Sequence, residues 1–466
     1  MHDRIRHLAM FCGLRCHAAI FHRLAAVFVC AALVVVSLLF AALSAPPAAA
    51  AAADAPQPPP AQASHDALAA LAAALGKDAG SGESLATREF AKIPLTKDDA
   101  AKARNLAWQH HADWIKENRA AEIKARLLTY EKFKMPFYMT TFGKQPKAGW
   151  SLWISMHGGG GAPQQVNDQQ WENQKHLYKL DEGIYLAPRA PTDNWNLWHE
   201  AHIDPLFDRL IEDLIVLEHV DPNRVYIMGY SAGGDGVYQL APRMADRWAA
   251  AAMMAGHPND ASWLGLRNIG FAIQAGGLDS AYNRNKVAQQ WIDRLDQLHH
   301  DDPQGYLHYG KIFPNKGHWM DREDAKVLPW MAAIKRNPLP DKVVWKQSPV
   351  VHDRFYWLAV PDGHSPQPGA EVVAERAGQT VEIKTADNIR ALSIRLDDRM
   401  ADLDRPVRVV DRGAVLFEGR PPRTIATLLQ TLAKRGDPDL MFDSEIIVKL
   451  PDEPKTAEKV ETKQAP

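Results

Sequence analysis

Short apolar runs alternate with amphipathic stretches between residues 127 and 337. This alternation predicts an α/β fold around a mostly parallel sheet, because consecutive parallel strands need a crossover segment, usually a helix, between them. We expect strands near residues 151–156, 183–187, 225–229, 249–254, 269–274 and 308–313. Helices are expected between these strands, notably at 208–218 and 287–298.

The pattern differs on both sides of this region. Residues 65–125 have helical spacing, and Thr96, which precedes Asp98 and Asp99, is the expected N-cap of a helix. After Pro340, short β-branched or alternating runs separated by turn residues predict a small β-sandwich, with one helical stretch at 424–432. The strands expected there lie near 354–360, 381–384, 392–396, 407–410, 415–418 and 446–450.

The N-terminus has the order of a secretory signal. Four arginines precede an apolar run from Leu24 to Leu43, and an alanine-rich sequence follows the run up to Asp54. This order predicts a signal peptide that is cleaved near Asp54. The alternative is an uncleaved membrane anchor, since about 20 apolar residues can span a bilayer. Both interpretations predict export, either to the periplasm or medium or to the outer face of the inner membrane.

These patterns divide the chain into six segments. They are a signal peptide or anchor (1–53), an Ala/Pro linker (54–64), a helical segment (65–125), the α/β domain (126–338), the β-rich domain (341–450) and a disordered tail (451–466).

Composition narrows the possible chemistry. The formal net charge is −2, and no block of Lys and Arg occurs, so a nucleic-acid partner is not expected. All three cysteines, Cys12, Cys16 and Cys30, precede the expected cleavage site. A processed chain would therefore have no thiol for a cysteine nucleophile or a thiolate metal site.

The hexapeptide from Gly229 to Gly234 carries the main functional signal. It places Ser231 between an expected strand and an expected helix, with glycines two residues before and after it. This is the pattern of a nucleophile elbow, in which a side chain at Gly229 or Gly233 would collide with the neighbouring strand or helix. The bare pattern arises by chance in roughly one chain in ten of this length. The surrounding sequence must therefore show whether Ser231 is a nucleophile.

A glycine run from His157 to Gly161 follows an earlier expected strand. In this context such a loop supplies one N–H group of an oxyanion hole, here from Gly158 or Gly159, and Ala232 supplies the other. The alternative of a phosphate cradle lacks the Gly-Lys-Ser/Thr ending of a P-loop.

A serine nucleophile needs a histidine base and a carboxylate that orients it. His318 and Asp279 each follow one of the last two expected strands, in the order serine, acid, histidine. Asp235 and Asp260 are the rival acids.

With these residues in place, the chain resembles an α/β-hydrolase of the secreted esterase branch, similar to poly(3-hydroxybutyrate) depolymerases and feruloyl-esterase-like proteins. The resemblance covers about residues 127–337 and includes the segment from Pro188 to Pro191, followed by Trp195. It implies that Ser231 attacks an acyl carbon, that His318 transfers the proton and that Asp279 holds the imidazole. No cofactor is implied.

Further residues are expected to contact substrate: His157, Trp195, Trp198, His199, Tyr230, His257 and Trp319. The pair His199 and His202 also invites a metal interpretation. Zinc proteases place their two histidines at i and i+4, whereas these are at i and i+3, so no metal is expected.

Three functions stay open at this point. The first is hydrolysis of a small or polymeric carboxylic ester. The second is a serine peptidase of the prolyl-oligopeptidase type, although the roughly 70 residues before the α/β domain are fewer than two propeller blades. The third is a non-catalytic exported binding protein. The C-terminal β region would either bind a polymer or cover the hydrolase region.

Overall fold

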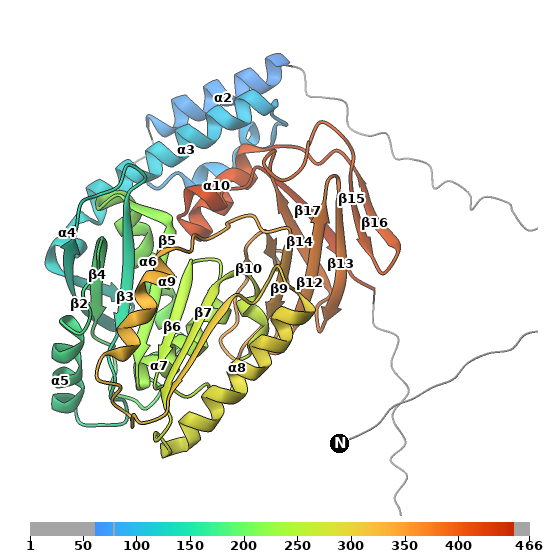
Figure 1. Cartoon of the computed structure of the whole chain (residues 1–466). Helices are drawn as coiled ribbons and strands as arrows, with labels where there is room; N and C mark the ends of the chain where they lie inside the picture. Colours follow the sequence, from blue (N-terminus) through green and yellow to red (C-terminus); the bar gives the residue numbers. More distant parts are fainter. Residues whose placement is uncertain (1–60, 78–79, 452–466) are drawn as a thin grey trace, which may run out of the picture. The chain divides into compact units, whose positions relative to one another are not determined.

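The computed structural model describes residues 61–77 and 80–451 (Figure 1). The signal or anchor predicted for 1–53, including the run from Leu24 to Leu43, lies outside the described residues, as do most of the linker and the tail. Among the helices that the structure describes, none combines the length and apolar character that a membrane crossing requires.

An eight-stranded sheet forms the centre of the α/β region, in the order β1-β2-β4-β3-β5-β6-β7-β8. Strands β1 and β2 are antiparallel, β2 is antiparallel to β4, and all other neighbours are parallel, as predicted. The bounds are β1 (Leu127–Tyr130), β2 (Phe133–Phe142), β3 (Trp150–Met156), β4 (Gly183–Pro188), β5 (Val220–Tyr230), β6 (Ala250–Met254), β7 (Gly270–Gly276) and β8 (His308–Phe313).

Helices cover both faces of this sheet, which explains why its central parallel strands β6 and β7 are completely buried. One face packs against α6 (Ile203–Leu217), α7 (Ala232–Arg243) and α8 (Arg284–Asp301). The other face packs against α9 (Leu328–Ala332) and Trp171 of α5 (Gln164–Lys175). Helix α6 begins five residues before its predicted start, because Pro205 in its first turn is compatible with a helix.

The N-terminal helical segment comprises α2 (Ala61–Leu75), α3 (Lys97–Asn118), α4 (Ala120–Ala125) and two short 3₁₀ turns, η1 (Glu83–Thr87) and η2 (Glu89–Lys92). Helix α2 starts at Ala61, within the predicted linker. The predicted N-cap is confirmed, since Thr96 Oγ1 accepts a hydrogen bond from the Asp99 N–H at 3.3 Å.

The C-terminal region contains two sheets, β10-β11-β14-β17 and β16-β15-β13-β12-β9. Their strands are β9 (Lys342–Lys346), β10 (Arg354–Phe355), β11 (Leu358–Ala359), β12 (Glu371–Ala377), β13 (Thr380–Asp387), β14 (Ala391–Leu396), β15 (Val407–Asp411), β16 (Ala414–Gly419) and β17 (Ser444–Lys449). The single strand predicted at 354–360 is a short hairpin that turns at Tyr356, which has φ 54°. Apolar side chains of both sheets join the core of the α/β region, so a separate β-sandwich domain stays a prediction.

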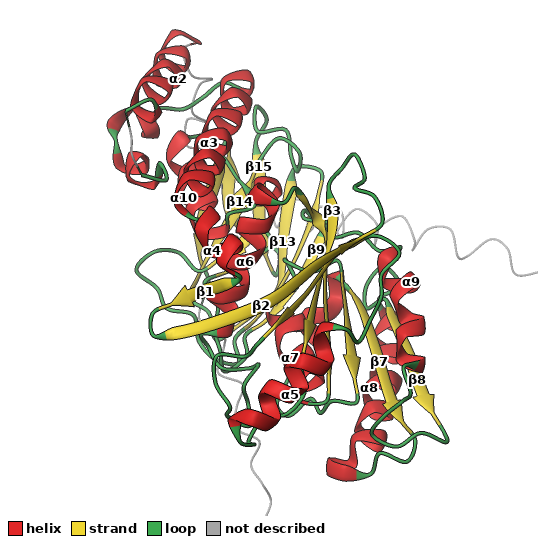
Figure 2. Ribbon diagram, turned by 90° about the vertical axis from the view of Figure 1, so that its left-hand side faces the viewer, coloured by secondary structure: helices red, strands yellow, loops and turns green. Residues whose placement is uncertain are grey.

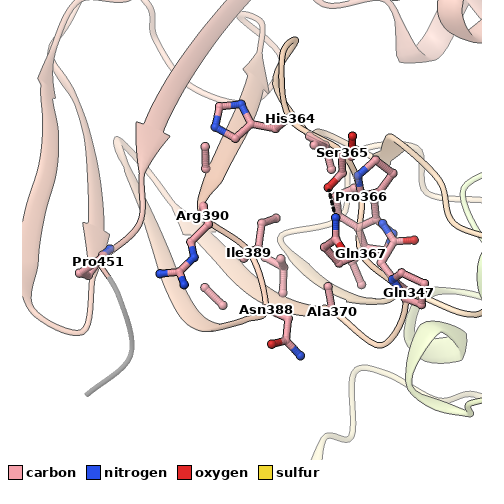
Figure 3. Close-up of a pocket in the computed structure, with 16 residues that line it drawn as sticks. Gln347, His364, Ser365, Pro366, Gln367, Ala370, Asn388, Ile389, Arg390 and Pro451 are labelled. Atoms are coloured by element: carbon pink, nitrogen blue, oxygen red, sulfur yellow. Dashed lines mark hydrogen bonds between the residues drawn. The ribbon is translucent and has the colours of Figure 1, made fainter. Parts of the chain in front are cut away.

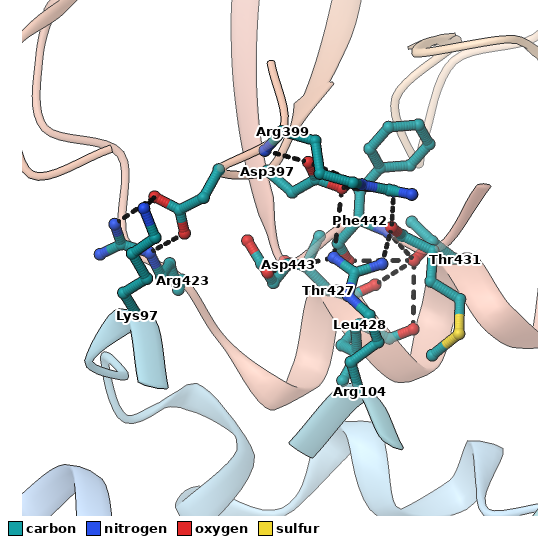
Figure 4. Close-up of polar contacts among 12 residues, drawn as sticks. Lys97, Arg104, Asp397, Arg399, Arg423, Thr427, Leu428, Thr431, Phe442 and Asp443 are labelled. Carbon is teal, nitrogen blue, oxygen red and sulfur yellow. Dashed lines mark hydrogen bonds and ion pairs between the residues drawn. The ribbon is translucent and has the colours of Figure 1, made fainter. Parts of the chain in front are cut away.

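Helix α10 (Ile425–Arg435) connects the C-terminal region to the N-terminal helices. Leu428 and Leu432 of α10 pack with Leu71 of α2 and Ala103 of α3, and Figure 2 shows the three helices together. Arg104 of α3 adds polar contacts, because it donates to the Met441 carbonyl and pairs with Asp397 and Asp443, each at 3.2 Å (Figure 4).

Buried ion pairs also join the C-terminal region to the α/β region. Arg336 Nη1 lies 2.7 Å from Asp437 Oδ2, and both side chains are almost completely buried. Arg247 Nη1 approaches the same carboxylate at 3.8 Å. Burial raises the pKa of Asp437, but the Arg336 guanidinium outweighs that effect and holds the pKa below its usual range.

Removing this carboxylate should therefore destabilise the whole fold. We expect Asp437→Ala to lower the free energy of unfolding by about 3–5 kcal/mol, because it leaves Arg336 buried without a counter-charge. Urea denaturation at neutral pH measures the change. Glu418→Ala, which breaks an exposed pair with Arg408 (3.3 Å), is the control and should cost less than about 1 kcal/mol. Equal losses in the two variants would contradict the interpretation.

Candidate active site

Ser231 occupies a sharp turn between β5 and α7, as the sequence predicts. Its backbone has φ 58° and ψ −121°, a conformation that L-residues rarely adopt. A Cβ at Gly229 would lie 2.2 Å from the Gly233 carbonyl oxygen, and one at Gly233 would lie 2.2 Å from the Met156 carbonyl oxygen. Only glycine therefore allows the helix to come this close to the strands.

Ser231, His318 and Asp279 form one chain of hydrogen bonds. Ser231 Oγ lies 2.9 Å from His318 Nε2, and Asp279 Oδ2 lies 2.7 Å from His318 Nδ1. An ionised carboxylate only accepts hydrogen bonds, so Nδ1 carries the proton and Nε2 is left to accept from the serine hydroxyl. Asp279 is buried, whereas the His318 side chain is 44% exposed. The arrangement can take a proton from Ser231 and give it to a departing group.

The two rival acids have other partners. Asp235 Oδ1 accepts from the His257 N–H at 2.6 Å, and burial raises the pKa of this carboxyl. Asp260 Oδ1 accepts from Gln239 Nε2 at 2.8 Å.

Tyr230 holds the loop that carries His318. Its hydroxyl donates to the His318 carbonyl at 2.7 Å and accepts from the Met320 N–H at 2.9 Å. The side chain is 7% exposed, and burial raises its pKa. The sequence predicts a substrate contact here, but the hydroxyl is fully used inside the protein, so we reassign Tyr230 to positioning.

The glycine loop lies against the nucleophile. A Cβ at Gly158 would come within 3.2 Å of Ser231 Cβ. The N–H groups of Gly160 and Gly161 donate to Asn167 Oδ1 and the Asp193 carbonyl, at 2.8 and 2.9 Å. No acceptor within residues 61–77 and 80–451 engages the N–H groups of Gly158, Gly159 or Ala232.

His157 and Trp198 are both completely buried, which corrects the prediction that they contact substrate. His157 Nε2 accepts from the Ala190 N–H at 3.1 Å, so Nδ1 donates to the Gly158 carbonyl at 2.6 Å. Trp198 Nε1 donates to the His157 carbonyl at 2.8 Å. Burial lowers the pKa of His157 to about 4. These side chains fix the glycine loop from beneath.

The remaining predicted contact residues are more accessible. Trp195 and Trp319 are 62% and 49% exposed, and His199 and His257 are half-buried. Burial lowers the pKa of His199 to about 4. Leu278 and Tyr282, which flank Asp279 in the sequence, are also exposed and were not predicted. Their position close to Asp279 in the sequence was the signal that could have found them.

Two further positioning residues were missed. Asn167 in α5 is completely buried; besides accepting from Gly160, it donates to the Ala162 carbonyl at 3.0 Å. Arg189 bonds to Asp168 at 2.8 Å and to Asp193, and so fixes the loop after β4. Arg189 lies in the segment from Pro188 to Pro191, which supports the resemblance, so this segment was the sequence signal that could have identified it.

His199 and His202, the two histidines of the metal interpretation, contact different aromatic rings. His199 lies edge-on to Trp195, with a centroid distance of 5.3 Å. His202 stacks on Phe133 with a centroid distance of 3.6 Å. In the part of the chain that the structure describes, no three or more His, Cys, Asp or Glu side chains come together as metal ligands could.

Three cavities formed by the described residues are large enough for a small ligand, and one of them, of about 520 Å³, lies beside Asp168 and Arg189. The other two are larger. One, of about 730 Å³, adjoins Trp195 and His199. The other, of about 710 Å³, lies in the C-terminal region between His364 and Asn388 (Figure 3).

No family model and no curated protein matches the chain. Similar solved structures include a thermostable esterase, with 17% identity and a TM-score of 0.35, covering 45% of this chain and 62% of that one. The BES protein from Bacillus cereus has 10% identity and a TM-score of 0.34, over 44% of this chain and 93% of that one. A phospholipase/carboxylesterase from Dyadobacter fermentans has 15% identity and a TM-score of 0.30, over 41% and 95%. The similarity is limited and extends to less than half of the chain.

The buried imidazole of His157 should make stability depend on pH. Its pKa is about 4 in the fold, against an ordinary 6.5, so between these values the unfolded chain binds a proton that the native state does not. The contribution is fully present above pH 6.5 and is lost as the pH falls, by about 3 kcal/mol at pH 4. Urea denaturation from pH 7 to pH 4 measures this, as the difference between wild type and His157→Gln. The exposed His65→Gln is the matched control, and parallel curves for wild type and His157→Gln would refute the assignment.

Proposed function

We propose that this protein is a serine hydrolase that cleaves a carboxylic ester through an acyl-serine intermediate. The observation that carries the proposal is the hydrogen-bonded chain from Ser231 through His318 to Asp279, with the serine on a turn that only flanking glycines permit. The N-terminal sequence pattern supports action outside the cytoplasm.

In the first half of the reaction, Ser231 Oγ attacks the acyl carbon and its proton passes to His318 Nε2. The developing oxyanion is stabilised by the N–H of Ala232 and by that of Gly158 or Gly159. Asp279 stabilises the imidazolium and keeps the ring in the required tautomer. His318 then gives the proton to the departing alkoxide, which leaves as the alcohol.

In the second half, a water molecule attacks the acyl-serine. His318 accepts a proton from the water and returns it to Ser231 Oγ as the carboxylic acid departs. The exposed rings of Trp195, Trp319 and Tyr282 favour substrates with an apolar acyl or alcohol part at this edge. An amide could enter the same chemistry, so the test includes one.

Ser231→Ala should lower kcat by roughly 10⁴-fold to 10⁶-fold, because the nucleophile is lost. Hydrolysis of p-nitrophenyl butyrate, set beside an aminoacyl p-nitroanilide, measures the loss and separates esterase from peptidase. Labelling by a fluorophosphonate, read by intact mass, should occur in wild type and in the control Ser84→Ala but not in Ser231→Ala. Wild-type protein that neither turns over an ester nor takes the label would exclude the proposal, and turnover of the anilide alone would make it a peptidase.

Tyr230→Phe should lower kcat by about tenfold and leave KM nearly unchanged, because the loop that positions His318 loses both hydrogen bonds to the hydroxyl. The steady-state parameters for p-nitrophenyl butyrate measure this split. Tyr356→Phe removes a buried hydroxyl that donates to the Ala245 carbonyl at 3.0 Å, away from the triad. Both variants should lose about 1–3 kcal/mol of stability. A similar fall of kcat in both would show that Tyr230 acts only through stability.

A further inference from the structure

The cavity of about 730 Å³ beside Trp195 has the size of a small-molecule site. It is formed by the turn between β1 and β2, the loop between β4 and α6, one side of α7, and residues at the start of the C-terminal region. With Asp260, which lies in the loop after β6, five separate segments of the chain meet around it.

None of Ser231, His318 and Asp279 lines this cavity, but the glycine loop connects its wall to the candidate nucleophile. A Cβ at Gly160 would lie 2.9 Å from the Trp195 carbonyl oxygen, so the loop touches the segment that lines the cavity. Two residues earlier, Gly158 packs against Ser231. On the opposite side, Asp260 in the cavity wall is three residues from His257, which is bonded to Asp235 in the first turn of α7.

Three carboxylates, Glu131, Glu200 and Asp260, line the cavity, and the hydrogen-bond partners of Glu200 and Asp260 are neutral. Glu200 accepts from the Thr192 hydroxyl at 2.5 Å and from Asn194 Nδ2 at 2.8 Å. Asp260 accepts from the amide of Gln239. Among the described residues, no Lys or Arg nitrogen lies within 4 Å of Glu131, Glu200 or Asp260. Their negative charges are thus not compensated by the protein.

Arg243 and the two histidines of the wall do not change this balance. Arg243 Nη2 pairs with Asp204 Oδ1 at 2.5 Å, so its charge is neutralised within the protein. Burial lowers the pKa of His199 to about 4 and also lowers that of His202, so both rings are neutral at pH 7. Lys132 places its Nζ over the Phe133 ring, 5.3 Å from the centroid.

Two buried polar atoms of the wall residues, His202 Nε2 and Arg243 Nε, lack a hydrogen-bond partner within the described part of the chain. His202 Nε2 has no hydrogen bond within the described part of the chain, and the nearest carboxylate oxygen, of Glu200, is 3.8 Å away. The His202 side chain is 7% exposed. Unpaired polar atoms buried this deeply are uncommon because they cost free energy, so this atom points to a polar group that enters the cavity. Trp195 and Tyr130 add aromatic surface to the same wall.

We propose that this cavity binds a cationic group, an alkylammonium or guanidinium, carried by the acyl or alcohol part of the substrate. Glu200 and Asp260 supply the counter-charge, and the rings of Trp195 and Tyr130 offer faces on which a cation is attracted. The proposal rests on the proposed function for its substrate, and it disfavours carboxylate-bearing esters.

Charge-matched substrate pairs test it. On the alcohol side, acetylcholine is compared with its uncharged isostere 3,3-dimethylbutyl acetate. On the acyl side, p-nitrophenyl esters of equal length end in an ammonium, a methyl or a carboxylate group. We expect the cationic ester to have a kcat/KM at least about fivefold higher in one series, with the preference weakening as salt rises from about 20 to about 500 mM.

Two variants locate the effect. Glu200→Gln and Asp260→Asn should each reduce the ratio of cationic to neutral kcat/KM, and Glu117→Gln, which removes an exposed charge on α3, should keep the wild-type ratio. Turnover of neutral esters with no cationic preference would overturn the cation site while leaving the proposed hydrolase intact.

A binding measurement keeps the two proposals separable. Calorimetric titration of wild-type protein with propyltrimethylammonium chloride should show binding that the Glu200→Gln/Asp260→Asn double variant weakens about tenfold, the product of two charge losses. Absence of propyltrimethylammonium binding overturns the cation site. Binding of a neutral methyl glycoside instead of the cation also overturns it. Binding of the cation without any ester turnover or fluorophosphonate labelling would support the site and remove the proposed function.

Discussion

The contact of helix α7 with strands β3 and β5 is made by backbone atoms at Gly229 and Gly233, and the rest of the site follows from it. The contact forces Ser231 to φ 58°, a conformation that costs of order 1–3 kcal/mol and persists only where the surroundings hold it. They do so through hydrogen bonds from the Ser231 N–H to the Met254 carbonyl at 2.9 Å and from the Asp235 N–H to the Ser231 carbonyl at 3.0 Å. The side chain then stands at the sheet edge, beside the start of α7, where helix N–H groups have no acceptor within the helix.

Sequence order could predict that Ser231, Asp279 and His318 meet, because each follows a strand and β5, β6, β7 and β8 are successive neighbours in the sheet. The direction in which each side chain points was harder to predict. His157, Trp198 and Tyr230 lie in the right segments, but their polar atoms bond to backbone within the protein, and nothing local in the sequence shows which way a side chain turns. Asn167 carries no motif at all, since its role arises only when α5 packs beside the glycine loop.

The elements of the fold also fall into those that the sequence predicts and those that it does not. Strand β8 was predicted to the residue, and β6 to within one, because apolar runs bounded by turns are clear signals. Strand β2 was missed, since Pro136 interrupts its pattern, and β12 was missed because a bulge between Val373 and Ala374 breaks its alternation of apolar and charged residues. Buried Arg336 and Asp437 could not be anticipated either. Each resembles a surface residue until its partner, 101 positions away, is brought next to it.

Burial determines the protonation state of two histidines around the site. His157 and His199 are held neutral because desolvation opposes the charged form, and they therefore act as fixed hydrogen-bonding groups around neutral pH. The surroundings of His318 differ, since its side chain is 44% exposed and bonded to a buried carboxylate. Glu200 and Asp260 line a cavity in which no Lys or Arg nitrogen of the described residues lies within 4 Å of them. Under the proposed cation site, neutral or cationic substrates are preferred to anionic ones, because an incoming carboxylate would meet the like charges of Glu200 and Asp260.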